Sequence, residues 1–344
     1  MKVFFANSSD DARRWQQYVE DNPDCTHYHR WGWKQVIETS FRWPTYFLMA
    51  EEEGQVVGIL PLALQSSRIF GRFLTSLPFL NGGGPVARTG KVEEDLVAAA
   101  IVLAQELRAD HMELRYRREP QPGNLRTKMT KVAVVRPVEA DEDKMLRDLP
   151  HKVRTDVRKA MKSDFTAELV GETGLDDFYR IFSVNMRNLG TPAYSRNFFQ
   201  EMLNTFPAET YICVIRHHGK PVAASFLMGF RRTIEAGWSS SLQEYLALKP
   251  NVFLYWSIFC LTGARGYRTF DFGRSSVGSG THRFKMQWGS QEIPLYWAYW
   301  LPDGASLPEL NPQNPRYRVA IWLWKHLPVS LTTWAGPRIV RCLP

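Results

Sequence analysis

The chain has 344 residues, of which 44% are hydrophobic and 23% charged, so it is an ordinary globular protein long enough for two domains. A net charge of +8 and a pI near 9.3 favour anionic partners: phosphates, nucleic acid or an acidic membrane surface. The four cysteines lack the spacing of a disulfide framework or a zinc site, so we expect no metal. The N-terminus lacks the apolar region of a secretion signal, and no apolar run approaches the ~18 residues of a bilayer span. We therefore expect a cytoplasmic protein.

The first part of the chain alternates strand-like and helix-like segments. A helix is indicated where Trp33, Ile37 and Phe41 recur at helical spacing, and this places Trp33 in the core. Turn residues Glu53-Gly54 separate two apolar runs, which predicts a strand pair. The predicted elements are a strand Lys2–Ala6, a helix Asp10–Glu20, the helix carrying Trp33, and strands Phe47–Ala50 and Val56–Leu64.

The sequence contains an internal repeat. Shifting the chain by 165 residues aligns Trp33–Leu64 with Phe198–Gly229 without a gap and with seven identities. Each half then continues with a helix and a short strand, expected at Val92–Arg108 and His111–Tyr116 in the first half, and at Val252–Ala264 and Thr269–Phe272 in the second. The common element order predicts a duplicated α/β domain, with domains at 1–143 and 144–344.

A basic helix opens the second domain. Asp148 can cap it, with Pro150 in the first turn. Its apolar residues share one face, while cations line both flanks. We interpret Arg154 and Arg158 as part of a basic wall that binds phosphates; a solvated linker helix is the alternative.

Two further segments offer ligand contacts. Gly190 and Pro192 end a helix in a way that places Arg187 and Tyr194 where a ligand can reach them, although a simple helix stop explains the same pattern. Trp31 is a candidate wall of an acceptor cleft in the first domain.

The stretch from Arg268 to Glu292 is the main candidate site. A short strand runs into Gly273-Arg274 and then into a Ser/Gly loop, whose N–H and hydroxyl groups can bind an anion or an oxyanion. Asp271, on the strand face opposite Phe270 and Phe272, is a candidate base, and a structural Asp271 bound to Arg274 is the alternative. The remaining candidates are His282 as base, Lys285 and Arg274 for phosphates, Ser275 and Ser276 for hydrogen bonds, and Trp288 as a substrate contact. A flexible surface hairpin is the alternative for the whole stretch.

The C-terminal segment from Tyr317 to Leu343 mixes tryptophan and leucine with arginine and lysine. Such a mixture can lie on an anionic membrane surface, or it can pack on its own domain.

Two motifs resemble a known family. The runs Phe270-Asp271-Phe272-Gly273-Arg274-Ser275 and Phe284-Lys285-x-x-Trp288-Gly289, behind the basic helix, resemble FemA/FemB-type transferases. The likeness is greatest to the subgroup associated with exosortase (PEP-CTERM) protein sorting and exopolysaccharide systems. It implies an α/β fold of two tandem domains resembling the GCN5-related N-acetyltransferase (GNAT), with mixed central sheets flanked by helices.

The resemblance also implies a reaction. It is acyl or aminoacyl transfer to an amine or hydroxyl of a cell-envelope or exopolysaccharide precursor, an anionic molecule linked to a nucleotide or a lipid. The donor is an aminoacyl-tRNA or an acyl-CoA, with no tightly bound cofactor, and tRNA would then be a partner. Ala247–Asn251 lacks the glycines that cradle a pyrophosphate in acyl-CoA enzymes, whereas Asn81–Pro85 is a candidate anion nest. The alternatives are an acyl-CoA-dependent N- or O-acyltransferase of the same fold, and a non-catalytic module that binds a glycan or nucleotide-sugar in an export system.

Overall fold

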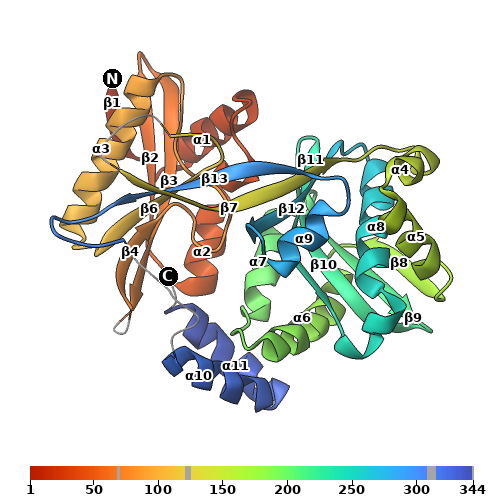
Figure 1. The fold of residues 1–344 in the computed structure, drawn as a ribbon. Coiled ribbons are helices and arrows are strands. Elements are labelled where there is room, and N and C mark those ends of the chain that lie inside the picture. The colour runs from red at the N-terminus through yellow and green to blue at the C-terminus, as the bar shows by residue number, and fades with distance from the viewer. Residues whose placement is uncertain (68–69, 121–124, 308–314, 343–344) are drawn as a thin grey trace. The chain divides into compact units, whose positions relative to one another are not determined.

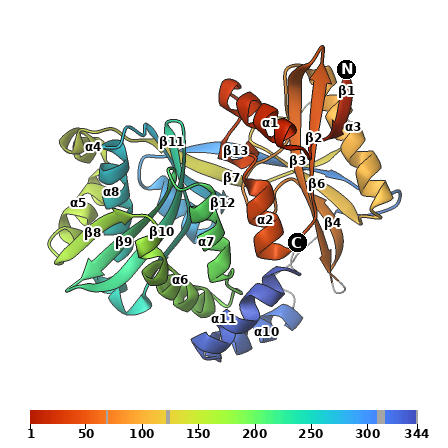
Figure 2. The ribbon, with the colours of Figure 1, turned by 180° about the vertical axis from the view of Figure 1, so that it is seen from behind.

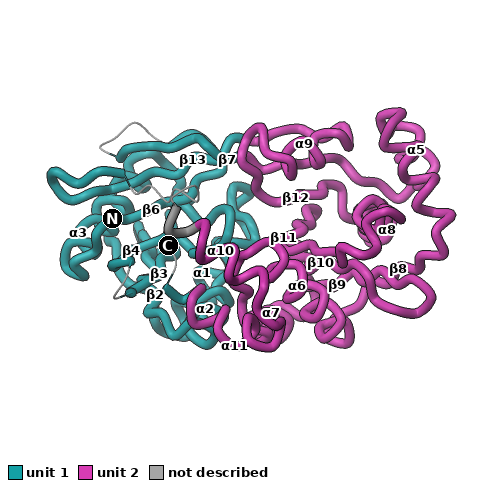
Figure 3. The backbone as a smooth tube through the Cα atoms, turned by 60° about the horizontal axis from the view of Figure 1, so that its bottom comes forward, with its two compact units in different colours: residues 1–131, 294–310, 341–344 teal, residues 132–293, 311–340 magenta. Residues whose placement is uncertain are grey.

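The computed structural model describes residues 1–67, 70–120, 125–307 and 315–342. The chain forms two compact units (Figure 3): unit 1 comprises residues 1–131, 294–310 and 341–344, and unit 2 comprises 132–293 and 311–340. These units differ from the domains predicted at 1–143 and 144–344. Residues 132–143 pack with unit 2, and strand β13 (Gln291–Trp300) returns the chain to unit 1 by pairing with β6 (His111–Tyr116). Sequence periodicity does not reveal such a return, because it depends on a long-range strand pairing.

Unit 1 contains a mixed sheet in the strand order β1-β2-β3-β4-β6-β13, with β5 pairing with β3. Helix α3 covers one face of this sheet, and helices α1 and α2 cover the other (Figures 1 and 2). Leu96, Ala100 and Leu103 recur at helical spacing along α3 and are buried in the core beneath it. The remaining elements of unit 1 are β1 (Lys2–Phe5), α1 (Ser9–Asp21), a 3-10 helix (His27–His29), α2 (Trp33–Phe41), β2 (Thr45–Glu52), β3 (Gln55–Ser67), β4 (Gly71–Thr75), β5 (Val86–Ala87) and α3 (Gly90–Glu106).

Unit 2 is built in the same way, with the strand order β7-β12-β11-β10-β9-β8. Helices α6 and α7 cover one face, and α8 covers the other with α5 packed on its outer side. Helix α8 is apolar around most of its circumference because it is buried between the sheet and α5. The elements up to the middle strand are β7 (Arg126–Pro137, which begins in unit 1), α4 (Glu142–Asp148), α5 (His151–Ala160), β8 (Phe165–Val170), a 3-10 helix (Glu172–Gly174), α6 (Leu175–Leu189), α7 (Arg196–Thr205), β9 (Thr210–His217) and β10 (Lys220–Phe230). The later elements are β11 (Thr233–Ser241), a 3-10 helix (Gln243–Leu248), α8 (Pro250–Gly263), β12 (Thr269–Ser276), α9 (Gly280–Met286), α10 (Pro315–His326) and α11 (Val329–Val340).

The predicted duplication is visible in the backbone of each unit. Strands β2 and β9 begin at Thr45 and Thr210, which the repeat aligns. The hairpin turns that follow have the same conformation, with positive φ at Glu53 (49°) and Gly54 (79°), and at His218 (48°) and Gly219 (78°). In each unit a parallel pair then forms over three positions, between β4 and β6 and between β11 and β12. The predicted fold class, mixed sheets flanked by helices, is confirmed.

Three local predictions need correction. Asp148 is the last residue of α4, a helix that was not predicted, and does not cap the basic helix. That helix, α5, begins after Pro150, whose fixed φ suits the start of a helix. Strand β12 does not end at Phe272 but continues to Ser276, and α9 starts at Gly280, so the Ser/Gly loop is shorter than expected. Trp33 lies in the core, as predicted, with 0% of its surface exposed.

The core of unit 2 depends on Phe259 in α8. Its ring lies 4.9 Å from that of Phe270 and 5.2 Å from that of Trp288, and it is 0% exposed. We expect Phe259→Ala to lower the free energy of unfolding by about 3–5 kcal/mol, because it removes a buried ring and leaves a cavity. Urea unfolding followed by circular dichroism measures this. Leu246→Ala, at a site 47% exposed, is the control and should change it by less than about 1 kcal/mol; equal losses would contradict the assignment.

Candidate active site

The candidate site lies in unit 2, where the pairing of β11 and β12 ends. The two strands pair at Thr233 with Thr269, at Ile234 with Phe270 and at Glu235 with Asp271. Both strands then continue, to Ser241 and Ser276, but the ladder between them does not. Just beyond the last pair, a Cβ built on Gly237 would meet no atom within 4 Å, so there is open space beside β11. The end of the ladder therefore leaves room for a ligand beside β11.

Three buried ionisable side chains meet at this end of the ladder. Phe270 and Phe272 pack against Tyr255 and Phe259 of α8, so the alternation of the strand places Asp271 on the opposite face, as predicted. Glu235 is its neighbour on β11, and α9 contributes Lys285. The exposed fractions of Glu235, Asp271 and Lys285 are 4%, 1% and 5%. We call these three residues the buried charge cluster.

The cluster holds a kink in β12 at Gly273. This residue has a φ of 70°, a conformation that favours glycine. Its N–H donates to Asp271 Oδ1 over 2.8 Å. Lys285 Nζ donates to the carbonyl oxygen of Gly273 over 3.1 Å and to that of Arg274 over 2.9 Å. Asp271 and Lys285 thus hold the two sides of one peptide segment, an arrangement that we call the Gly273 clamp.

Burial determines the charge state of Lys285. It lowers the pKa of the Lys285 ammonium to about 8, against the opposing attraction of Asp271 and Glu235. At neutral pH the ammonium is therefore mostly charged but loses its proton far more readily than an ordinary lysine. A lysine has three N–H donors, and the two carbonyls of the clamp use two of them. A protonated Lys285 can thus stabilise negative charge that develops nearby.

The serine after Arg274 is a buried polar residue beside the clamp. Ser275 is 5% exposed, and its Oγ has no hydrogen-bond partner among the residues that the structure describes. Buried hydroxyls are nearly always paired, so an unpaired one next to the clamp fits a group that hydrogen-bonds to a ligand. Arg274 and Ser276 flank it and are partly exposed.

His282 is held from both sides. Its Nδ1 accepts a hydrogen bond from the Gly278 N–H over 3.2 Å, and its Nε2 lies 2.8 Å from Glu292 Oε1. Because Nδ1 is an acceptor, Nε2 carries the proton that bonds to Glu292. With both nitrogens engaged, His282 fixes the loop before α9 and is poorly placed to remove a substrate proton.

Five predicted contacts in unit 2 are not part of the clamp. Trp288 is a core residue, 1% exposed, because it packs on Phe259. Arg154 donates to the carbonyl of Arg147 over 2.8 Å, and Arg158 is exposed on α5. Arg187 and Tyr194 serve the packing of α6: Arg187 donates to the Leu327 carbonyl over 3.1 Å, while the ring of Tyr194 packs with those of Phe182, Phe198, Phe199 and Trp238.

Unit 1 places a closed ion pair at the equivalent position. Glu113, which pairs with Thr75 of β4, receives Arg115 Nε over 2.6 Å and the Tyr299 hydroxyl over 2.7 Å. Burial favours the neutral acid, but Arg115 and Tyr299 outweigh it and lower the pKa of Glu113. Arg115 also donates to the Leu80 carbonyl over 2.6 Å. Residues of unit 1 itself therefore satisfy this carboxylate.

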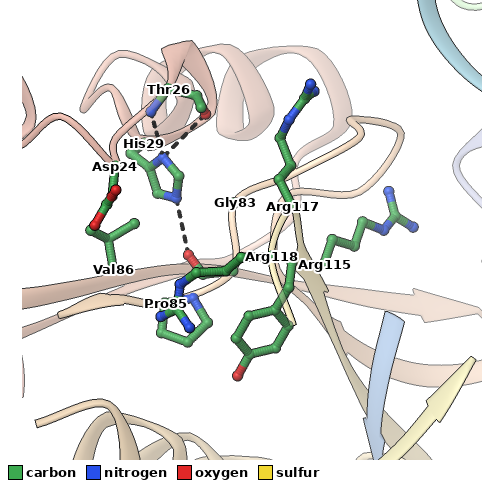
Figure 4. Close-up of a pocket in the computed structure, with 11 residues that line it drawn as sticks. Asp24, Thr26, His29, Gly83, Pro85, Val86, Arg115, Arg117 and Arg118 are labelled. Carbon is green, nitrogen blue, oxygen red and sulfur yellow. Dashed lines mark hydrogen bonds between the residues drawn. The ribbon is translucent and has the colours of Figure 1, made fainter. Parts of the chain in front are cut away.

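The predicted anion nest lies beside a small pocket of unit 1, with a cavity volume of about 160 Å³ (Figure 4). The Gly84 N–H donates to the Arg115 carbonyl over 2.8 Å, and the Gly84 carbonyl bonds to His29 Nε2 over 3.0 Å. Burial lowers the pKa of His29 to about 4, so its imidazole is neutral. Arg118 forms an ion pair with Glu93. The Gly84 amide is thus unavailable to an anion, which corrects the prediction at this position.

Trp31 of unit 1 packs in an aromatic cluster, with its ring 5.8 Å from that of Trp15 and 5.3 Å from that of Phe47. Its position is that of a packing residue at the edge of the core. Among the residues that the structure describes, no group of three or more histidine, cysteine, aspartate or glutamate side chains is placed to hold a metal ion.

The clamp makes a pH-dependent contribution to stability. The pKa of Lys285 is about 8 in the folded protein and 10.5 as an ordinary lysine, so between these values the unfolded chain binds more protons and stability rises with pH. Between pH 8 and 9.5, we expect the free energy of unfolding of the wild type to rise by about 1–2 kcal/mol more than that of Lys285→Met. Urea unfolding at each pH measures the difference. Lys220→Met, at an exposed position, should show no such gain; a flat difference for Lys285→Met would contradict the assigned pKa.

A known family matches the part of the chain that contains this site. Residues 151–286, which include the buried charge cluster, match the family described as acetyltransferase (GNAT) domain. No curated protein sequence matches the chain.

Solved structures share the fold over most of the chain. The crystal structure of FemX has a TM-score of 0.66 at 12% identity, covering 86% of this chain and 97% of FemX. L-PGS from Bacillus licheniformis has a TM-score of 0.58 at 11% identity, covering 94% of this chain and 98% of the other. A tandem GNAT protein from the clavulanic acid biosynthesis pathway has a TM-score of 0.54 at 11% identity, covering 89% and 100%. Residues 151–286 of unit 2 are thus similar to acetyltransferase domains of the GNAT type, and the prediction of an acyltransferase is confirmed.

Proposed function

We propose that the protein is a FemAB-like transferase that moves an acyl or aminoacyl group to an amine or hydroxyl of a cell-envelope or exopolysaccharide precursor. The Gly273 clamp, at the point where β11 and β12 stop pairing, is the observation that carries this proposal. The likeness of the fold to FemX supports it. Within this class we propose the exosortase-associated subgroup, because the two motifs that resemble it contain the clamp residues. We also propose that the protein acts in the cytoplasm.

The chemistry requires little beyond alignment and charge stabilisation. The acceptor nitrogen or oxygen attacks the carbonyl carbon of the activated donor, forming a C–N or C–O bond while the ester C–O or thioester C–S bond breaks. The acceptor proton passes to Asp271, and the leaving oxygen or sulfur is protonated in turn. The protonated Lys285 and the unpaired Ser275 hydroxyl stabilise the oxyanion formed in between. The donor enters as a substrate, so this mechanism needs no resident cofactor.

Two features of unit 2 favour an aminoacyl-tRNA as donor. Helix α8, whose N-terminus would receive the pyrophosphate of an acyl-CoA, begins with Pro250, which has no N–H. The preceding Lys249 is engaged in an ion pair with Asp156. Helix α5 meanwhile presents Arg158 and other exposed cations to solvent, as a phosphate backbone would require. The opposing candidate, an acyl-CoA donor, is favoured by the family match over residues 151–286.

Substitutions at the clamp distinguish an enzyme from a protein that only binds its ligand. We expect Asp271→Asn and Lys285→Met each to lower kcat about 100-fold or more while the KM for the donor changes little, because both residues act on the reacting atoms. Transfer of a radiolabelled aminoacyl or acetyl group to extracted envelope precursors measures this. Asp303→Asn and Lys220→Met, at exposed positions, are the matched controls.

Thermal unfolding of every variant separates loss of catalysis from loss of fold. Unchanged turnover in folded Asp271→Asn would reject Asp271 as base. If the wild type binds a glycan or nucleotide-sugar yet transfers no group from either donor, the non-catalytic module replaces the transferase.

Binding measurements distinguish an aminoacyl-tRNA donor from an acyl-CoA donor. We expect charged tRNA to bind in a salt-sensitive manner, and Arg154→Ala with Arg158→Ala to weaken it about tenfold, because two phosphate contacts are lost. Filter binding over a salt series measures the affinity. Lys220→Ala with Arg232→Ala removes the same charge from another exposed part of unit 2 and should have little effect. Retention on immobilised CoA without tRNA binding would instead establish the acyl-CoA donor.

A further inference from the structure

The C-terminal helices α10 and α11 of unit 2 have one side that is packed. Arg187 of α6 donates to the carbonyl of Leu327, between the two helices. A Cβ built on Gly190, at the end of α6, would lie 2.5 Å from Ile321 Cγ2, and one on Gly336 of α11 would lie 2.9 Å from the Ala193 backbone. These close approaches fix the two helices to α6 and determine which side chains remain outside.

The outer side is unusually apolar. Six large hydrophobic side chains are exposed there, by 36% to 61%. They are Val319, Trp322, Leu323, Leu331, Trp334 and Ile339. Single exposed hydrophobic residues are normal on a protein surface, but six within two adjacent short helices mark an interaction surface. We call these six residues the apolar surface of α10 and α11.

Cations lie beside this surface, in a segment that contains no acidic residue. The sequence from Pro315 to Pro344 contains no aspartate or glutamate. Arg318, Lys325 and Arg338 are exposed. On α10, Arg318, Trp322 and Lys325 follow at i, i+4 and i+7 and thus share one face. The side chains of Arg316, Tyr317 and Leu343, which belong to the same segment of the sequence, lie outside the described residues.

Part of this surface is hollowed on α10, where two of the cations and two of the apolar residues lie together. Arg318, Val319, Ile321, Trp322 and Lys325 enclose an open cavity volume of about 560 Å³ on α10. On α11, the Arg338 guanidinium lies 4.3 Å from the centre of the Trp334 ring, which is 61% exposed. Tryptophan rings with arginine and lysine beside them are suited to the boundary between lipid headgroups and acyl chains.

The charge pattern selects among the possible occupants. A second copy of the chain, meeting this surface symmetrically, would bring arginine and lysine against arginine and lysine. A nucleic acid would match the charge but leave the six hydrophobic side chains without a partner. A lipid surface with anionic headgroups satisfies both. The helices can only lie on it, since no described helix is both long and apolar enough to cross a membrane.

We propose that the apolar surface of α10 and α11 docks on an anionic lipid bilayer. Headgroup phosphates bind Arg318 and Lys325, while Trp322 and Trp334 enter the headgroup region. The sequence left open whether this segment lies on a membrane or packs on its own domain; one side packs on α6, and the proposal concerns the other. It rests on the surface alone and not on the transfer reaction, so failure of the transferase assays would leave it standing.

Vesicle flotation with the full chain tests this proposal. We expect the wild type to float with phosphatidylglycerol vesicles, to remain unbound with phosphatidylcholine vesicles, and to be released by high salt. Trp322→Ala with Trp334→Ala should lower the partition coefficient at least about tenfold by removing apolar contact. Arg318→Gln with Lys325→Gln should lower it at least about tenfold by removing headgroup attraction.

Matched controls use exposed residues elsewhere. Met129→Ala with Leu246→Ala, and Lys220→Gln with Arg232→Gln, should bind as the wild type does. Thermal unfolding confirms that each variant is folded. Absence of wild-type flotation with phosphatidylglycerol, or equal flotation of all variants, would overturn the proposal. So would sedimentation showing a dimer that Trp322→Ala with Trp334→Ala dissociates while flotation is unchanged.

Discussion

The site in unit 2 depends on one interaction, the bond between a buried lysine and the carbonyl oxygens of a kinked strand. A buried ammonium is costly unless it is paired and hydrogen-bonded. Lys285 meets both conditions through two backbone carbonyls and the nearby carboxylates of Asp271 and Glu235. In return, it fixes α9 against β12 and holds Gly273 in a conformation that favours glycine. The residues beyond the kink, including the unpaired Ser275 hydroxyl, depend on it for their position.

The two units show how a duplicated framework can diverge in chemistry. Each contains a parallel strand pair that ends after three positions with a buried carboxylate, Glu113 in unit 1 and Asp271 in unit 2. In unit 1 the cation is Arg115 on the same strand, and it pairs directly with the Glu113 carboxylate. In unit 2 the cation is Lys285 of helix α9, and it donates to two backbone carbonyl oxygens of β12. This difference makes the second unit the better candidate for catalysis.

The tryptophans of this protein fall into a buried group and an exposed group. Trp33 and Trp288 fill the cores of their units, and Trp31 packs beside Trp15 at the edge of one. Trp322 and Trp334 are instead exposed beside arginine and lysine on α10 and α11. Composition alone cannot separate these groups, because both are tryptophan near apolar neighbours in the sequence. Burial separates them, and it directs the search for a partner to the C-terminal helices.

Local patterns in the sequence were enough to predict the duplication, the two hairpins, the position of Trp33 and the opposite faces of Phe270 and Asp271. These features follow from side-chain periodicity and turn chemistry, which act over a few residues. Only the tertiary structure placed Glu235 beside Asp271, since the whole of α8 lies between them in the chain. It also decided that both nitrogens of His282 are engaged and that β13 returns to unit 1. Pairings between distant segments depend on which surfaces the folded chain brings together, and a linear pattern does not contain that information.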